Sequence, residues 1–392
     1  MLSDCTESKP LRSATHVREA KPDESASVQG IKRIFSSSFS SSHSGALERM
    51  PKWLICVPLV VQWLCLALRH GSASLPSTAN PCITAGGLVG EGKREYFQGM
   101  GALARAATAP WCAITPGPGR LRTNIHSAMQ DAGLVFPVVA KPDLGMCGFG
   151  VRLIGNASEL AHYLAVFPPL QVVVLQAYLA DVGEAGIFYA RYPDHGQTKT
   201  QGRIIGLALR HFPQVTGDGL KTTGELIATS ARTRRLLDTA HHELSANTSA
   251  IPPAGQIVRL ATIGSTRVGG LYTDGGIHIT AQLTAAIDAI ARDMPQFHFG
   301  RFDVRFSSLA ELREGRGIKI MEINGAGSEV IEAWDPDTSL LDALRIIFAK
   351  QSLLFSIGSA MRKLGHRPVG LGELARLHFM QQRLLDQYPP SN

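Results

Sequence analysis

Two apolar segments between residues 299 and 324 carry polar side chains at alternate positions, and this pattern restricts the fold more than any other part of the chain. The first segment contains Asp303, and the second, Lys-Ile-Met-Glu-Ile-Asn, contains Glu322 and Asn324. Side chains on a strand alternate between its two faces, so we expect Glu322 and Asn324 to share a face with Ile320. If the two strands pair, Asp303 joins that polar face.

Carboxylates and amide oxygens are hard ligands, which suit Mg²⁺ or Mn²⁺ bridging a polyphosphate better than they suit zinc. We therefore predict that Asp303, Glu322 and Asn324 bind a metal ion. The alternative is a hydrogen-bonded polar patch at the edge of a sheet. Because clustered carboxylates repel each other in the absence of metal, we expect removal of either charge to leave the fold at least as stable.

Composition narrows the class of protein. The chain has 392 residues, of which 44% are hydrophobic and 18% charged, so it can bury a full core and hold two or more lobes. Its net charge of +7 comes without a long Lys/Arg run or interleaved aromatics. We expect no nucleic-acid partner, and anionic nucleotides or a membrane surface instead. Six cysteines without a C-x-x-C pair favour a reducing, cytoplasmic compartment.

The first third of the chain divides into three segments. Residues 1–49 are polar and serine-rich, which predicts a disordered leader or an extension upstream of a natural start at Met50. Residues 50–70 form an apolar helical segment whose core, 53–68, is marginal for a membrane span. We rank association with the inner face of the cytoplasmic membrane first, a buried core helix second and an exported signal peptide last. Residues 71–135 are rich in Pro and Gly and should be loop-rich.

Strands and helices mix after residue 135 without strict alternation, which is typical of an α+β fold. We assign residues 136–350 to one domain and 351–392 to a C-terminal helical segment. The expected strands are near 136–141, 171–178, 185–192 and 202–212, and the expected helices near 157–166, 223–245, 282–293, 339–363 and 370–387.

A phosphate-binding element is predicted at the end of the first of these strands. Lys141 ends the strand and is followed by Gly145, Gly148 and Gly150. Glycines let backbone N–H groups approach anionic oxygens, and the ammonium group supplies counter-charge. The alternative is an ordinary glycine-rich turn beside a solvated lysine. The spacing matches neither a P-loop nor a dinucleotide-binding turn.

A second nucleotide-binding element is predicted downstream. An apolar strand ends in Gln176, Tyr178 and Leu179, and Glu184 follows. Such a linker can offer backbone groups to adenine and a carboxylate to ribose. A plain core strand with a surface glutamate is an equal alternative. Arg210 adds a cation at a later turn.

Taken together, these motifs resemble the ATP-grasp superfamily, and within it the D-alanine–D-alanine-ligase-like carboxylate–amine ligases. The likeness covers about residues 136–340, and its most specific part is Glu-Ile-Asn-Gly-Ala-Gly-Ser-Glu. It implies two α+β lobes that grip ATP, with a reduced N-terminal segment and C-terminal helices. The usual N-terminal lobe is reduced here, and residues 263–269 replace an expected polar loop, so the substrates stay open.

The resemblance also implies roles for individual residues. Lys141 and the glycine flap would cover the phosphates, with Lys93 as a second phosphate lysine unless it is simply solvated. The implied ATP-binding residues are Lys93, Lys141, Gly145, Gly148, Gly150, Gln176, Tyr178, Leu179 and Glu184. The implied catalytic cations are Arg301, Lys141 and Arg210, and the implied ligands of Mg²⁺ or Mn²⁺ are Asp303, Glu322 and Asn324.

The implied reaction activates a small carboxylate as an acyl phosphate, from which an amine displaces phosphate. Two rivals remain open. One is a non-catalytic nucleotide-binding module that docks on a membrane or a partner, and the other is a small-molecule kinase.

Overall fold

A computed structural model describes residues 45–116, 121–181, 183–194, 196, 198–234, 236–237, 243–244 and 246–392. The chain divides into two units, Met1–Ser41 and Ser42–Asn392, and the elements below belong to the second. Residues 1–44 of the predicted leader lie outside the described residues.

The last residues of that predicted leader are ordered, so the prediction of disorder is wrong for 45–49. They form α2 (Ala46–Arg49). Leu47 is buried in an apolar cluster with Ile55 and Ile347, and the Glu48 carboxylate pairs with Arg232 at 2.7 Å. A buried leucine and a shielded ion pair hold this short segment against the rest of the fold.

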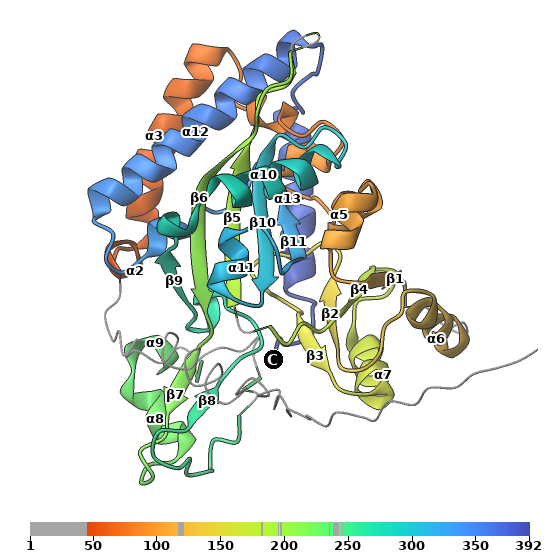
Figure 1. The fold of residues 1–392 in the computed structure, drawn as a ribbon, viewed down its shortest axis with the longest axis vertical. Helices are drawn as coiled ribbons and strands as arrows, with labels where there is room; N and C mark the ends of the chain where they lie inside the picture. The colour runs from red at the N-terminus through yellow and green to blue at the C-terminus, as the bar shows by residue number, and fades with distance from the viewer. Residues whose placement is uncertain are drawn as a thin grey trace, which may run out of the picture. The chain divides into compact units, whose positions relative to one another are not determined.

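The larger of the two main sheets carries most of the predicted site. Its five antiparallel strands run in the order β11 (Ile318–Asn324), β10 (Phe299–Phe306), β5 (Gly183–Ala190), β6 (Arg203–His211) and β9 (Leu271–Asp274). One face packs on α10 (Ala281–Arg292) and α11 (Leu309–Arg313) through the main apolar core. α12 (Leu340–Lys363) covers part of the opposite face, and Figure 1 shows these helices on the two sides of the sheet.

A β-bulge interrupts the pairing of β10 with β11. Asp303 lies opposite Glu322, but its neighbour Val304 lies opposite Ile320, so Met321 is an extra residue. A bulge of this kind reverses the side-chain alternation of its strand. Ile320 is therefore buried in the core on the α10 face, and the prediction that it shares a face with Glu322 is wrong.

The smaller sheet takes one of its strands from residues 71–135, the segment that the sequence predicts to be loop-rich. Its antiparallel strands are ordered β1 (Trp111–Ile114), β4 (Val173–Ala177), β2 (Val138–Pro142) and β3 (Arg152–Ile154). Residues 71–135 supply β1 together with η1 (Leu75–Thr78), η2 (Thr84–Gly87), α4 (Lys93–Gln98), α5 (Ala102–Ala107) and α6 (Leu121–Asp131). The loop-rich prediction is thus wrong for much of this segment.

Most of the other predicted elements are confirmed within a few residues. They include the strands named above and the helices α7 (Ala157–Val166), α10, α12 and α13 (Leu371–Leu385). The helix predicted near 223–245 is broken at Ser230 into α8 (Thr223–Thr229) and α9 (Ala231–Arg234), and residues 235, 238–242 and 245 of it lie outside the described residues. β7 (Gln214–Thr216) and β8 (Ile257–Arg259) form an antiparallel pair. The α+β class is therefore confirmed.

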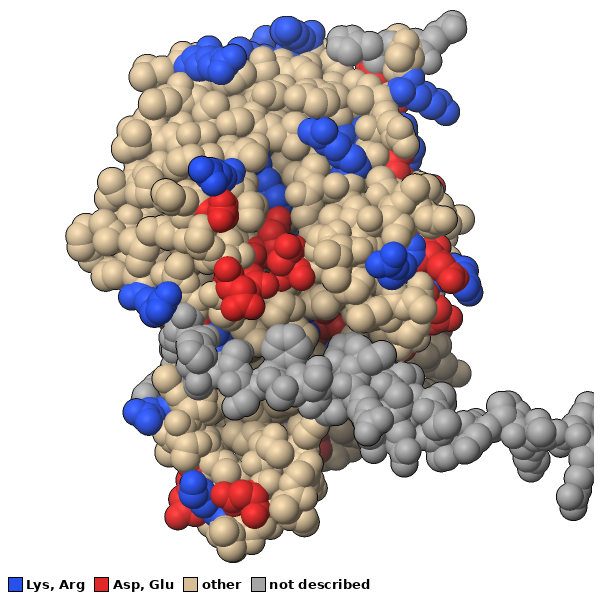
Figure 2. Space-filling view, turned by 60° about the vertical axis from the view of Figure 1, so that its left-hand side comes forward, with Lys and Arg blue, Asp and Glu red and all other residues tan. Residues whose placement is uncertain are grey.

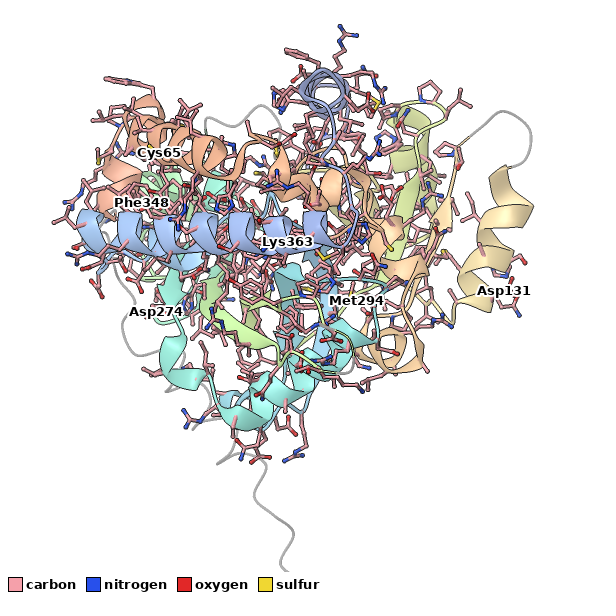
Figure 3. All side chains as sticks on the ribbon, turned by 90° about the horizontal axis from the view of Figure 1, so that it is seen from above. Cys65, Asp131, Asp274, Met294, Phe348 and Lys363 are labelled. Atoms are coloured by element: carbon pink, nitrogen blue, oxygen red, sulfur yellow. The ribbon has the colours of Figure 1, made fainter. Side chains whose placement is uncertain are left out.

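The apolar segment near the start of the described chain forms α3 (Lys52–His70), which packs along α12. Gln62 Nε2 donates to Phe348 O at 3.3 Å and to Ser352 Oγ at 3.1 Å, and the rings of Trp63 and Phe355 meet edge-on at 4.9 Å. Figure 3 shows the two helices side by side, with Cys65 on α3 and Phe348 on α12 labelled. One face of α3 is thus covered by protein.

The other face of α3 is apolar and exposed. Its valines and leucines are about half or more accessible, namely Val57, Val60, Val61, Leu64 and Leu68. Figure 2, which turns this side of the molecule forward, shows a broad uncharged surface in its upper part. Within the described ranges, α3 alone is long and apolar enough to cross a membrane by length and composition.

Candidate active site

Asp303 is the centre of a buried cluster of charges on the α12 face of the larger sheet. Arg301 Nε donates to its Oδ1 at 2.6 Å, and Arg301 Nη2 donates to its Oδ2 at 3.0 Å. Arg210 Nη1 lies 3.2 Å from Oδ2, and Asn324 Nδ2 donates to the same oxygen at 3.2 Å. Alternation along β10 and direct pairing with β11 bring Arg301, Asp303 and Asn324 to one face, and Arg210 reaches Asp303 from β6, across β5.

Two lysines from other elements complete this cluster. Lys93, the first residue of α4, is buried, and its Nζ lies 3.3 Å from Glu322 Oε1. Lys141, on β2, donates to Gln176 Oε1 at 2.6 Å and to Met321 O at 2.8 Å. The bulge turns the Met321 carbonyl toward the smaller sheet. The alternative of solvated lysines is therefore wrong for both.

Burial and neighbouring charges shift two of these groups in opposite ways. Burial lowers the pKa of Lys141 to about 8, although Glu322 opposes the shift. Burial raises the pKa of Glu322, but the attraction of Lys93, Lys141 and Arg301 outweighs it and holds the pKa below its usual value. Glu322 is therefore ionised at neutral pH.

The predicted ribose-binding residue, Glu184, joins the same network. It is buried, with Arg210 3.1 Å from Oε1 and Arg305 3.4 Å from Oε2. The alternative of a surface glutamate is therefore wrong. Because Arg210 contacts both Glu184 and Asp303, the charges form a continuous chain across β5, β6 and β10.

The predicted glycine flap, residues 145–150, lies against this cluster. Gly148 and Gly150 have φ values of 75° and 71°, which an L side chain rarely adopts. Arg267 donates to Gly148 O at 3.3 Å, and a Cβ on Gly145 would lie 3.2 Å from Lys93 Nζ. The flap thus lies beside Lys93, and its role over the phosphates stays a prediction.

Other residues that hold this arrangement carry weak signals in the sequence. Asp143 accepts hydrogen bonds from Arg94 N and Nε, each at 2.8 Å, and so fixes the first turn of α4. Tyr388 donates to Leu144 O at 2.6 Å, which ties the C-terminal segment to the flap. The sequence does not predict α4. Without that helix, Asp143 cannot be identified as a carboxylate that binds a helix N-terminus.

Two predicted adenine-binding residues, Tyr178 and Leu179, are half-buried at the end of β4. Tyr178 hydrogen-bonds Arg259. Gln176 is buried, and its side chain is taken up by Lys141. Their roles in nucleotide binding stay predictions.

The metal prediction also stays a prediction. Across the described part of the chain, no group of three or more His, Cys, Asp and Glu side chains could hold a metal ion. The predicted ligands are two carboxylates and an amide, and cations surround both acids. Such a set repels a bare divalent cation but fits one that enters with a polyphosphate, because the anion offsets the lysines and arginines.

Comparison with known proteins finds similarity among solved structures. No protein-family profile matches the chain, and no curated protein matches it in sequence. D-alanine–D-alanine ligase from Bacillus anthracis is 14% identical, with 70% of this chain and 69% of that chain covered and a TM-score of 0.38. VanG D-Ala:D-Ser ligase from Enterococcus faecalis is 14% identical, with 66% and 61% covered and a TM-score of 0.34.

A bifunctional glutathione synthetase from Pasteurella multocida is 16% identical, with 63% of this chain covered and a TM-score of 0.31. The chain spans about a third of that protein, 34% of its length. All three neighbours are ligases or synthetases by name. Similarity at this level does not define a reaction, so the assignment of one depends on the side chains of the site.

The environment of Asp303 reverses our expectation that loss of either carboxylate leaves the fold as stable. Asp303→Asn leaves two buried arginines without full compensation, so we expect it to lower the free energy of unfolding by about 3–5 kcal/mol. Glu322→Gln removes the carboxylate beside the buried ammonium of Lys93, but Glu322 is itself 34% exposed, so we expect a smaller loss of about 1–3 kcal/mol. Thermal unfolding of both variants tests this, and equal melting temperatures would contradict the account.

Proposed function

We propose that this protein is an ATP- and Mg²⁺-dependent ligase that joins a carboxylate to an amine through an acyl phosphate. The observation that carries the proposal is the surplus of positive charge around Asp303 and Glu322. Four cations, Lys93, Lys141, Arg210 and Arg301, come from separate elements to surround these two acids. With Glu184 and Arg305 of the same network included, five cations face three acids.

That surplus favours a multiply charged anion over other ligands. Burying cations without counter-charge is costly, so a site that keeps them is suited to a ligand that supplies the missing negative charge. A triphosphate does so, and the adjacent flap can donate backbone N–H groups to its oxygens. Lys141 and Asp303 are buried, so nucleotide entry would displace part of the wall around them, and the adjacent flap, residues 145–150, is the segment we propose to move.

The proposed roles follow from position. Lys93 and Lys141 would hold the phosphates of ATP, and Arg301 and Arg210 would balance charge as the γ-phosphoryl group moves to the carboxylate. Asp303, Glu322 and Asn324 would hold Mg²⁺, which supplies counter-charge to the phosphates when bound. In the first step a carboxylate oxygen bonds to phosphorus and ADP leaves. In the second, the amine nitrogen bonds to the acyl carbon, phosphate leaves and the nitrogen loses a proton.

Release of phosphate and ADP from Mg-ATP, screened against paired acids and amines, tests this function. We expect both products to appear only when an acid and an amine are present together. ADP with a phosphorylated product and no released phosphate would establish the kinase instead. Nucleotide binding without turnover for any pair would establish the non-catalytic module.

Lys141 offers a matched test of phosphate binding. Lys141→Ala removes a positioned cation, and we expect it to weaken ATP binding about 10- to 100-fold, since a hydrogen bond to a charged group contributes about 1.5–3 kcal/mol. Lys221→Ala is the control, because Lys221 is exposed in a loop. Calorimetric titration with ATP measures both variants, and equal affinities would return Lys141 to a structural role.

We further propose that the exposed face of α3 rests on the inner face of the cytoplasmic membrane, where ATP is available. The uncovered stripe of Val57, Val61 and Leu64 supports it, together with Lys52 and Arg69 near the two ends of the helix. An amphipathic contact of this kind buries an apolar face in the interface and attracts anionic lipids through flanking cations.

Flotation of the full chain with vesicles of anionic lipid tests the membrane contact. Val61→Asp and Leu64→Asp should release the protein from the vesicles, because each places a charge in the apolar interface. Leu220→Asp is the control, since Leu220 is 83% exposed outside α3. Flotation that survives both α3 substitutions, or that Leu220→Asp abolishes as well, would exclude this face.

A further inference from the structure

An apolar cavity of about 280 Å³ lies between α3, α12 and the larger sheet. Aliphatic and aromatic side chains make up most of its wall, including Leu59, Trp63, Phe188, Phe299, Trp334 and Leu354. Its size is near the lower end of the ~300–1,000 Å³ typical of small-molecule sites. A cavity with this lining favours an apolar ligand over water.

The cavity lies on the same sheet face as the charge cluster. Phe188 lies directly opposite Arg301 across β5 and β10, and Phe299 precedes Arg301 by two residues, so the three side chains share a face. At roughly 3.3 Å per residue, Phe299 is about 7 Å along the strand from Arg301. The charge cluster and the cavity are therefore next to each other on one face of the larger sheet.

The loop after β11 connects the two. Gly327, Ser328 and Glu329 line the cavity, and Arg301 Nη1 donates to Glu329 O at 2.8 Å. A ligand that follows this loop would thus contact the cavity at one end and Arg301 at the other.

Two polar side chains of the cavity wall differ, because one has an ionic partner and the buried oxygen of the other has no hydrogen-bond partner within the described part of the chain. Lys350 is paired with Glu332 and lies 3.7 Å above the centre of the Phe188 ring, so its charge is already compensated. Gln351 lines the cavity, and its buried Oε1 has no hydrogen-bond partner among the described residues. An unpaired buried acceptor is costly, so this oxygen is suited to a hydroxyl group carried on an otherwise apolar chain.

We propose that this cavity binds the apolar chain of the carboxylate substrate, so that the acid ligated here is a medium-chain aliphatic acid. The role of its carboxylate rests on the proposed ligase function, whereas binding of the chain does not. The carboxylate lies toward Arg301, and the chain runs along the sheet into the space between α3 and α12. A water molecule takes up roughly 30 Å³ in the liquid, and we use the same volume for each carbon of the chain. On that basis the cavity accommodates on the order of nine carbons.

Tryptophan fluorescence reports on the cavity without turnover. Trp63 and Trp334 line it, so bromine-labelled acids bound there quench their emission. We expect affinity for straight-chain acids of four to sixteen carbons to rise about fourfold per methylene and to level off near the filling length. The same quenching should fall when Trp63→Phe and Trp334→Phe are combined. Affinity that does not depend on chain length would overturn the proposal.

Cavity-filling variants localise the binding. Leu354→Phe and Ile347→Phe each occupy part of the space, and we expect at least a tenfold loss of affinity for ten-carbon acids. Leu341→Phe, on the exposed part of α12, is the control and should bind them as the parent chain does. If neither filling variant weakens binding, or if the control weakens it equally, the chain is bound elsewhere and the proposal is wrong.

Titration of the same variants with Mg-ATP separates the two hypotheses. Both filling variants should keep the parent affinity for nucleotide, because their side chains lie outside the phosphate-binding cluster. Chain binding without any nucleotide binding would contradict the ligase and leave the cavity assignment intact. Nucleotide-dependent ligation of short acids, with no chain binding, would contradict the cavity assignment alone.

Discussion

The interaction of Asp303 with Arg301 and Arg210 is the constraint on which the site depends. A carboxylate buried this deeply requires cations beside it, and buried guanidinium groups equally require the carboxylate. Through Arg210 the chain of charges continues to Glu184 and then to Arg305. These side chains are held in position by one another before any ligand binds, and preorganised charges of this kind need little rearrangement when a reaction shifts charge.

Local pattern predicts the elements of this site well, but it does not predict how the elements meet. The alternation of polar residues is sufficient to predict β10 and β11 and, if the two strands pair, a shared polar face for Asp303, Glu322 and Asn324; the register that places Asp303 opposite Glu322 comes from the structure. It cannot predict the bulge at Met321, because the carbonyl that the bulge releases is bound by Lys141, 180 residues away in sequence. Lys93 likewise carries no local signal, since its burial depends on the anchoring of α4 by Asp143.

The apolar segment at residues 52–70 shows the same limit. Its composition predicts a helix and leaves a membrane helix, a core helix and a signal peptide as alternatives. In the fold, one side of α3 packs on α12 and the other is exposed, so it combines features of the first two. That packing also forms the wall of the cavity beside Arg301. The proposed sites would then lie on the same side of the larger sheet. They are the membrane contact on α3, the cavity for the apolar chain and the charge cluster for the phosphates.

In the proposed function, the charge cluster binds a polyphosphate and the metal ion enters with it. Electron paramagnetic resonance of Mn²⁺, titrated with the full chain with and without ATP, tests this most directly. We expect weak binding of Mn²⁺ alone, tight binding when ATP is present, and loss of the ATP-dependent part in Glu322→Gln. Binding of Mn²⁺ that is equally tight without ATP, or unchanged in Glu322→Gln, would contradict the claim.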